Sequence, residues 1–137
     1  MSAEQNIAIA RRFFAEQDRR KGPLPPELCA PGYTVHVPGF PPMDIAGHSE
    51  LAKAFYAAFP DLKQTIDDAF AEDEKAVLRF TITGTHQGEL MGLPPTGRQV
   101  AVSGIAMFHI VGGTVAELHE IFDQMGLMQQ IGAMPSA

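Results

Sequence analysis

Cysteine is almost absent from this sequence, because Cys29 is the only one among 137 residues. A single cysteine cannot form an internal disulfide, so a disulfide framework and a cysteine-rich zinc site are both excluded within one chain. We expect Cys29 to act as a small, partly buried hydrophobic residue.

Basic residues and long apolar runs are also scarce. Ten Lys and Arg stand against sixteen Asp and Glu, which gives a net charge of −6. Nucleic acids and anionic membranes attract basic surfaces, so neither is an expected partner. No stretch approaches the roughly 18 apolar residues of a membrane span, and the charged segment 1–21 does not have the apolar run of a signal peptide. We therefore expect a cytoplasmic protein.

Several motifs that carry chemistry are missing from the sequence. It has no Walker loop, no GxGxxG and no GxSxG, so nucleotide binding and serine-hydrolase chemistry have no support. No two histidines have the three- or four-residue spacing that places two ligands on one helix face, and the nearest pair, His109 and His119, are ten residues apart. We therefore expect neither a metal site nor a cofactor.

The composition is that of a globular protein, with 45% hydrophobic and 19% charged residues. The length suits one domain over residues 1–137. Ser2 and Gln5 have the spacing of a capping box, and Gly22 ends the helix that they begin. Apolar spacing of three and four residues marks the buried stripe of that helix: Ile7, Ala10, Phe13, Phe14 and Gln17.

Later segments change from helical to alternating patterns. A helical turn over 26–30 and a strand over 33–37 precede a second helix, which begins near Gly47 and ends at Pro60. Its apolar face holds Leu51, Ala54, Phe55 and Ala58, and His48 near its start is expected to be solvated. Extended patterns then cover 64–70, 76–85, 100–111 and 115–122, and 124–132 is typical of a short closing helix.

Helices first and strands afterwards predict an α+β fold. Strands joined by short turns pair antiparallel, so we expect a curved antiparallel sheet packed against the N-terminal helices. Such a layered arrangement is cone-shaped, with an internal cavity between the sheet and the helices.

Four segments, in order, resemble the SnoaL-like polyketide cyclases, also called ester cyclases. They are Phe59-Pro-Asp-Leu62, Gly84-Thr-His-Gln-Gly88, Met91-Gly-Leu-Pro-Pro-Thr-Gly97 and the segment from Asp123 to Gly132. The resemblance implies the cone-shaped nuclear transport factor 2-like fold and a cofactor-free aldol ring closure. Relatives often carry a tryptophan four residues before the aspartate, where this chain has His119, so substrate identity is not carried over.

Asp123 is the predicted catalytic residue. From the residues alone it suits a helix N-cap before Met125-Gly-Leu-Met128. The resemblance implies a general acid/base at this place, and one residue can fill both roles. His86 ends the strand before the 88–97 loop, and we expect it near Asp123, where it either donates to a substrate carbonyl or bonds the loop backbone.

The remaining candidates are expected to line the pocket and bind substrate. We expect a three-residue turn at 111–113, which places His109 and His119 on one face, toward the cavity, whereas a two-residue turn would place them on opposite faces. Ile121 shares the face of His119, while Met107 and Met91 form either core or a flexible apolar wall. A histidine at the position of His36 follows the family pattern, and Tyr33 is either a ligand or half-buried packing.

These observations predict a cofactor-free enzyme that acts on a hydrophobic, carbonyl-containing small molecule. The specific expectation is intramolecular aldol cyclisation, in which Asp123 moves the proton and His86, His36 and His119 orient the substrate. A cofactor-free hydroxylase or isomerase, and a binding protein without catalysis, stay open as alternatives. We expect a homodimer.

Overall fold

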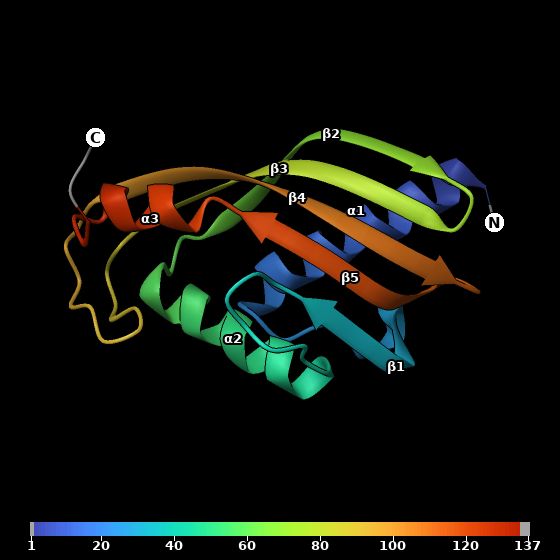
Figure 1. Cartoon of the computed structure of the whole chain (residues 1–137), viewed down its shortest axis with the longest axis horizontal. Coiled ribbons are helices and arrows are strands. Elements are labelled where there is room, and N and C mark those ends of the chain that lie inside the picture. Colours follow the sequence, from blue (N-terminus) through green and yellow to red (C-terminus); the bar gives the residue numbers. More distant parts are fainter. Residues whose placement is uncertain (1, 135–137) are drawn as a thin grey trace.

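The computed structural model describes residues 2–134 and shows a curved sheet that covers helices on its concave side (Figure 1). The elements follow one another along the chain, with a single 3-10 turn at Pro26–Leu28. They are α1 (Ala3–Arg20), β1 (Cys29–His36), α2 (Ile45–Ala58), β2 (Lys63–Glu72), β3 (Lys75–Thr85), β4 (Gln99–Val111), β5 (Thr114–Phe122) and α3 (Gln124–Gln130). No helix within these residues is long and apolar enough to cross a membrane.

The sheet has the strand order β1-β5-β4-β3-β2. Strands β2 to β5 pair antiparallel with their neighbours, and β1 pairs parallel with β5. The predicted α+β class and nuclear transport factor 2-like fold are confirmed. The sheet differs in one detail, since it is mixed: α2 and three strands separate β1 from β5 in the sequence, so no short turn dictates their direction.

Helix α1 begins with the predicted capping box. The Gln5 backbone N–H donates to Ser2 Oγ at 3.1 Å, and the Ser2 N–H donates to Gln5 Oε1 at 2.8 Å. The buried face holds Ala10, Phe13, Phe14 and Gln17 as predicted, with Asn6 buried beside them. Phe13 and Phe14 pack edge-on against Phe108 of β4, with ring centroids 5.4 and 5.7 Å apart, which fixes α1 under the sheet.

Two apolar clusters divide the interior. The larger one lies between α1 and strands β1, β3, β4 and β5, and includes Cys29, which is buried and unpaired. Burial raises the pKa of the Cys29 thiol to about 11, which keeps it protonated and inert. The smaller cluster gathers α2, α3 and the ends of β3 and β4. The pocket described next opens within this second cluster.

Candidate functional site

A narrow pocket lies between α2 and the concave face of the sheet, as predicted from the layered arrangement. The space open to the centre of a water-sized molecule is about 70 Å³. Its walls are mainly apolar, from Val37, Leu51, Ala52, Phe55, Phe59, Leu62, Ile82, Val100, Val102, Phe122 and Leu127. Five polar side chains complete the wall: Gln17, His48, Tyr56, Gln64 and Glu120.

Glu120 brings a carboxyl group into this apolar pocket. Along β5, Leu118, Glu120 and Phe122 face inward, while Glu117, His119 and Ile121 face outward. Of the pocket-lining residues, all within the described part of the chain, Glu120 alone is acidic. Burial raises the pKa of its carboxyl group to about 7, because the charged form loses its hydration there. A carboxyl group with that pKa can both accept and return a proton near neutral pH.

His48 contributes a neutral imidazole from the first turns of α2. Its ring is 5% exposed, and burial lowers the pKa of the imidazole to about 4. The expectation that His48 is solvated is therefore wrong. It lies on the buried stripe that continues through Leu51, Ala52 and Phe55. The helix begins at Ile45, two residues before the predicted start at Gly47, and Asp44 caps it by accepting from the Gly47 N–H at 2.8 Å.

Tyr33 holds the His48 ring from β1. The Tyr33 hydroxyl lies 2.8 Å from His48 Nδ1, and the two rings are nearly parallel, with centroids 6.1 Å apart. Burial raises the pKa of Tyr33 well above its usual range, and the nearby Cys29 and Glu120 add to the effect. Tyr33 therefore keeps its proton and can donate it to Nδ1. In that arrangement the proton of His48 is on Nε2, and the imidazole is a hydrogen-bond donor.

A second polar network anchors Tyr56, two turns further along α2 than His48. The Tyr56 hydroxyl donates to Asp18 of α1, and Asp18 also accepts from the Gln64 backbone N–H at 3.0 Å. The Gln64 side-chain amide reaches both Asp18 and the Tyr56 hydroxyl, at 3.3 and 3.4 Å. Burial, aided by Asp18, raises the pKa of Tyr56, so it stays a neutral hydroxyl. These bonds tie α1, α2 and β2 together around the pocket.

The structure places Asp123 at the start of α3, outside the pocket lining. Its Oδ1 accepts from the Gly126 N–H at 2.8 Å, which is the N-cap geometry considered from the sequence, and its side chain is exposed. The Asp123 N–H donates to the Ser103 carbonyl, so Asp123 is level with residue 103 of β4. Its catalytic role stays a prediction, and the pocket geometry points to Glu120 instead.

The predicted closeness of His86 and Asp123 is wrong. The His86 N–H donates to the carbonyl of Arg98, whereas Asp123 is level with Ser103, so five strand residues, about 16 Å, separate them along the sheet. His86 is fully buried but does not line the pocket. Its Nδ1 accepts from the Thr96 N–H at 3.3 Å and lies 3.0 Å from the Thr96 hydroxyl, so it holds the loop before β4.

His109, His119, Met107 and Ile121 lie on the outer face of the sheet, not on the pocket face that we predicted. The turn has two residues, Gly112 and Gly113, both with positive φ, since Val111 pairs with Thr114. A bulge next to His109 then shifts the register by one residue, so that His109 and His119 share a face as predicted. The same shift leaves Leu118 and Glu120 facing inward.

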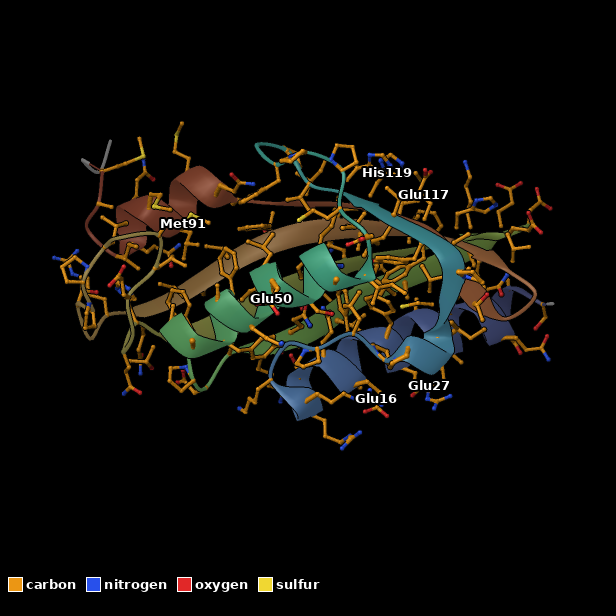
Figure 2. The ribbon with its side chains drawn as sticks, turned by 90° about the horizontal axis from the view of Figure 1, so that it is seen from below. Glu16, Glu27, Glu50, Met91, Glu117 and His119 are labelled. Carbon is orange, nitrogen blue, oxygen red and sulfur yellow. The ribbon has the colours of Figure 1, made fainter. Side chains whose placement is uncertain are left out.

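The other predicted ligands also lie outside the pocket lining. His36 is the register partner of His119 and bonds Glu117 on the outer face. Met91 is 57% exposed in the loop between β3 and β4, and Figure 2 shows it far from Glu117 and His119. Tyr33 is buried and reaches the site through His48. Their roles in substrate binding stay predictions.

Sequence reasoning missed Glu120 and His48, although each leaves a signal. Glu120 interrupts the otherwise apolar alternation of Leu118 and Phe122, and an unpaired acid on a buried face is unusual enough to indicate function. His48 has the helical spacing of Leu51, Ala52 and Phe55. The predicted three-residue turn at 111–113 placed Glu120 on the outer face of the last strand, so the first of these signals was overlooked.

Solved structures of other proteins have the same fold as this chain. A candidate hydroxylase, AclR from Streptomyces galilaeus, is 26% identical over 99% of this chain and 86% of its own, with a TM-score of 0.89. TsrD from Streptomyces laurentii is 27% identical over 98% and 99%, with a TM-score of 0.84. A candidate polyketide cyclase from Acidithiobacillus ferrooxidans is 32% identical over 96% and 97%, with a TM-score of 0.81.

No functionally curated protein matches the sequence. The family described as SnoaL-like polyketide cyclase matches residues 8–131, which is nearly all of the chain. Because the match extends from the first helix to the last, the chain belongs to the SnoaL-like polyketide cyclase family.

Proposed function

We propose that the protein is a cofactor-free acid/base enzyme that cyclises a hydrophobic, carbonyl-containing small molecule by an intramolecular aldol reaction. The observation that carries this proposal is Glu120, an acid in an apolar pocket whose pKa is raised to about 7. Carbon acids flanked by two carbonyl groups are acidic enough for a carboxylate base. A neutral, apolar pocket suits the rest of such a molecule.

The reaction is a proton transfer followed by ring closure. The Glu120 carboxylate takes a proton from the carbon between two carbonyl groups, which leaves an enolate. The enolate carbon attacks a third carbonyl carbon of the same molecule, so a carbon–carbon bond forms and the π bond of that carbonyl breaks. The new alkoxide takes the proton back from the Glu120 carboxylic acid, and the product is an isomer of the substrate.

His48 is proposed to stabilise the enolate oxygen. Its neutral ring donates from Nε2 when Nδ1 accepts from Tyr33, and a pre-oriented donor in an apolar site stabilises developing negative charge strongly. Gln17, which also lines the pocket, offers an amide donor to a remaining carbonyl group, while the amide of Gln64 is held by Asp18 and the Tyr56 hydroxyl. Tyr56 is held by Asp18 and shapes the wall between them.

A second candidate reaction is cofactor-free hydroxylation, which the likeness to the candidate hydroxylase AclR favours. The first step is the same proton abstraction by Glu120, but molecular oxygen then adds to the carbanion, and protonation gives a hydroperoxide. Loss of water breaks its O–O bond and leaves a new carbonyl group, so no further reductant is needed. The two reactions differ in the mass of the product. Cyclisation leaves the mass unchanged, or lowers it by one water if dehydration follows, and the reaction with oxygen adds one oxygen atom and removes two hydrogen atoms, which leave as water.

The test is incubation with an aromatic β-keto ester that bears a second ketone within reach of its activated carbon, followed by chromatography and mass spectrometry. We expect an isomeric cyclic product, formed faster than in buffer, and the same result in the absence of oxygen. A product with one oxygen atom more and two hydrogen atoms fewer, formed only in air, supports the hydroxylase instead. Tight binding of the ester without any product over several such esters contradicts both reactions and supports a binding protein.

A further inference from the structure

Three side chains with metal-ligand chemistry meet on the outer face of the sheet, where β1 pairs with β5. His36 and His119 are direct register partners, and Glu117 precedes His119 by two residues on the same face. Figure 2 shows Glu117 and His119 side by side next to β1. Their ligand atoms all lie within 4.8 Å of one another. The pocket lies on the opposite face, so this cluster is separate from the proposed active site.

The distances in the cluster are close to those of a metal site. His36 Nε2 lies 3.3 Å from Glu117 Oε2, and His119 Nε2 lies 3.1 Å from Glu117 Oε1. Ligands at 2.0–2.1 Å from a tetrahedral zinc ion are about 3.3–3.4 Å apart. The two distances end on different oxygens of Glu117, so the carboxylate lies between the two rings and can turn to place one oxygen, or both, on such an ion.

The cluster is also held in place by its surroundings. The rings of His36 and His119 come from two strands of the same sheet and stack with centroids 4.4 Å apart and planes 11° apart. The lone pairs in the two ring planes then run nearly parallel, so at least one ring must turn about its side-chain bonds before both Nε2 atoms point at one ion. Sites on strands are more rigid than sites on loops. The three side chains are 36–48% exposed, which leaves the fourth position of a tetrahedral ion open to water.

We propose that His36, Glu117 and His119 bind one divalent transition-metal ion of the zinc type. Two imidazoles and one carboxylate suit zinc and its neighbours in the first transition row. Each histidine moves its proton from Nε2 to Nδ1, so that both Nε2 atoms are free to coordinate, and no proton leaves the protein. The expectation of no metal site considered helical and hairpin spacing, whereas these ligands come from two strands that are far apart in the sequence.

The bound ion would act as a link between the edge strand and the sheet. The β1–β5 pairing has a register shift between Cys29 and Thr34, so its regular part is the short stretch that ends at His36 and His119. Tyr33, which holds His48 in place, lies three residues before His36 on the same strand. A metal at this position therefore steadies the strand that supports the pocket without entering the pocket.

Calorimetric titration of the chelator-treated full chain with Zn²⁺ tests the proposal. We expect one ion per chain, and at least about 100-fold weaker binding for His119→Gln, because even partners in the outer shell contribute 10–100-fold. His109→Gln is the matched control, since His109 lies on the same face but bonds Glu74 instead, 3.2 Å away. Its affinity for Zn²⁺ should equal that of the original chain.

Thermal unfolding and NMR of the original chain give a second readout that does not depend on a variant folding. Zn²⁺ should raise the melting temperature and shift the ring signals of His36 and His119 while leaving those of His109 in place. No binding at 100 μM Zn²⁺, or equal affinity of His119→Gln and His109→Gln, overturns the proposal. Ring-signal shifts confined to other histidines overturn it as well.

Discussion

A carboxyl group at position 120 costs the protein stability, and its pKa shows how the cost depends on pH. The pKa of Glu120 rises from 4.5 to about 7 on folding, so between these values the folded chain binds more protons than the unfolded chain. The contribution of Glu120 to the free energy of unfolding therefore falls as pH rises from about 4.5 to 7, and it stays low above pH 7. The difference between pKa values of 4.5 and about 7 is worth roughly 3 kcal/mol.

Glu120→Gln should consequently be more stable than the original chain at pH 8, by up to about 3 kcal/mol. The difference should be smaller at pH 5, because the stability that Glu120 removes is lost progressively as pH rises from about 4.5 to 7. Urea unfolding of both proteins at pH 5 and pH 8 measures the two differences. A stability difference that is the same at both pH values would show that Glu120 does not titrate as described.

His48 changes stability in the opposite direction. The pKa of its imidazole falls from 6.5 to about 4 on folding, so the unfolded chain binds more protons between these values, and stability rises with pH over that range. His48→Phe should flatten the rise, because phenylalanine cannot be protonated. Urea unfolding of both proteins between pH 4 and 6.5 follows the two slopes, and identical slopes contradict a buried, neutral His48.

At the scale of elements, the sequence predicted most boundaries to within a few residues, because each has a local physical cause. The capping box at Ser2 and the paired glycines at 112–113 mark their elements without help from the tertiary structure. The parallel pairing of β1 with β5 was harder to predict, since it depends on the path of the whole chain between the two strands. The bulge beside His109, which decides which face of β5 is inside, leaves no mark in a single sequence.

Gly22 is one of the positions where the packing of elements leaves no room for a side chain. Its φ is +125°, and an added Cβ would lie 2.7 Å from the Lys53 backbone nitrogen of α2. Gly22→Ala should therefore destabilise the protein by about 2 kcal/mol or more, seen as a lower melting temperature. Gly112→Asn is the control, since φ there is +59° and nothing lies within 4 Å. Equal melting temperatures for the two variants would contradict this view of the α1–α2 contact.

For the whole molecule, the order of helices and strands predicts the layered fold and its cavity. The candidate acid, in contrast, depends on which face of β5 points into that cavity. The sequence alone supported the family, the pocket and an acid in the last strand region. It could not separate Asp123 from Glu120, because they are three residues apart and so lie on opposite faces of an extended strand. Only the register of β4 against β5 decides between them.

The outer face of the sheet bears on the predicted homodimer. Ile105 and Ile121 are register partners on this face, and they are 52% and 61% exposed. Exposed apolar pairs in the middle of a sheet face are typical of interaction surfaces. Sedimentation velocity at micromolar concentration should show a dimer, and Ile121→Lys should shift it to monomer. A clean monomer of the original chain contradicts the prediction.

The most direct test of the account compares turnover of the β-keto ester by Glu120→Gln and Asp123→Asn at pH 7.5. Both changes replace a carboxylate by an amide of equal size, and the Asp123→Asn amide oxygen can still cap α3. We predict that Glu120→Gln lowers turnover about 10²- to 10⁴-fold, as for loss of one positioned proton-transfer group, while Asp123→Asn stays near the original rate. Near-normal turnover by a folded Glu120→Gln protein would contradict the account, and a large loss in Asp123→Asn alone would assign the proton transfer to Asp123.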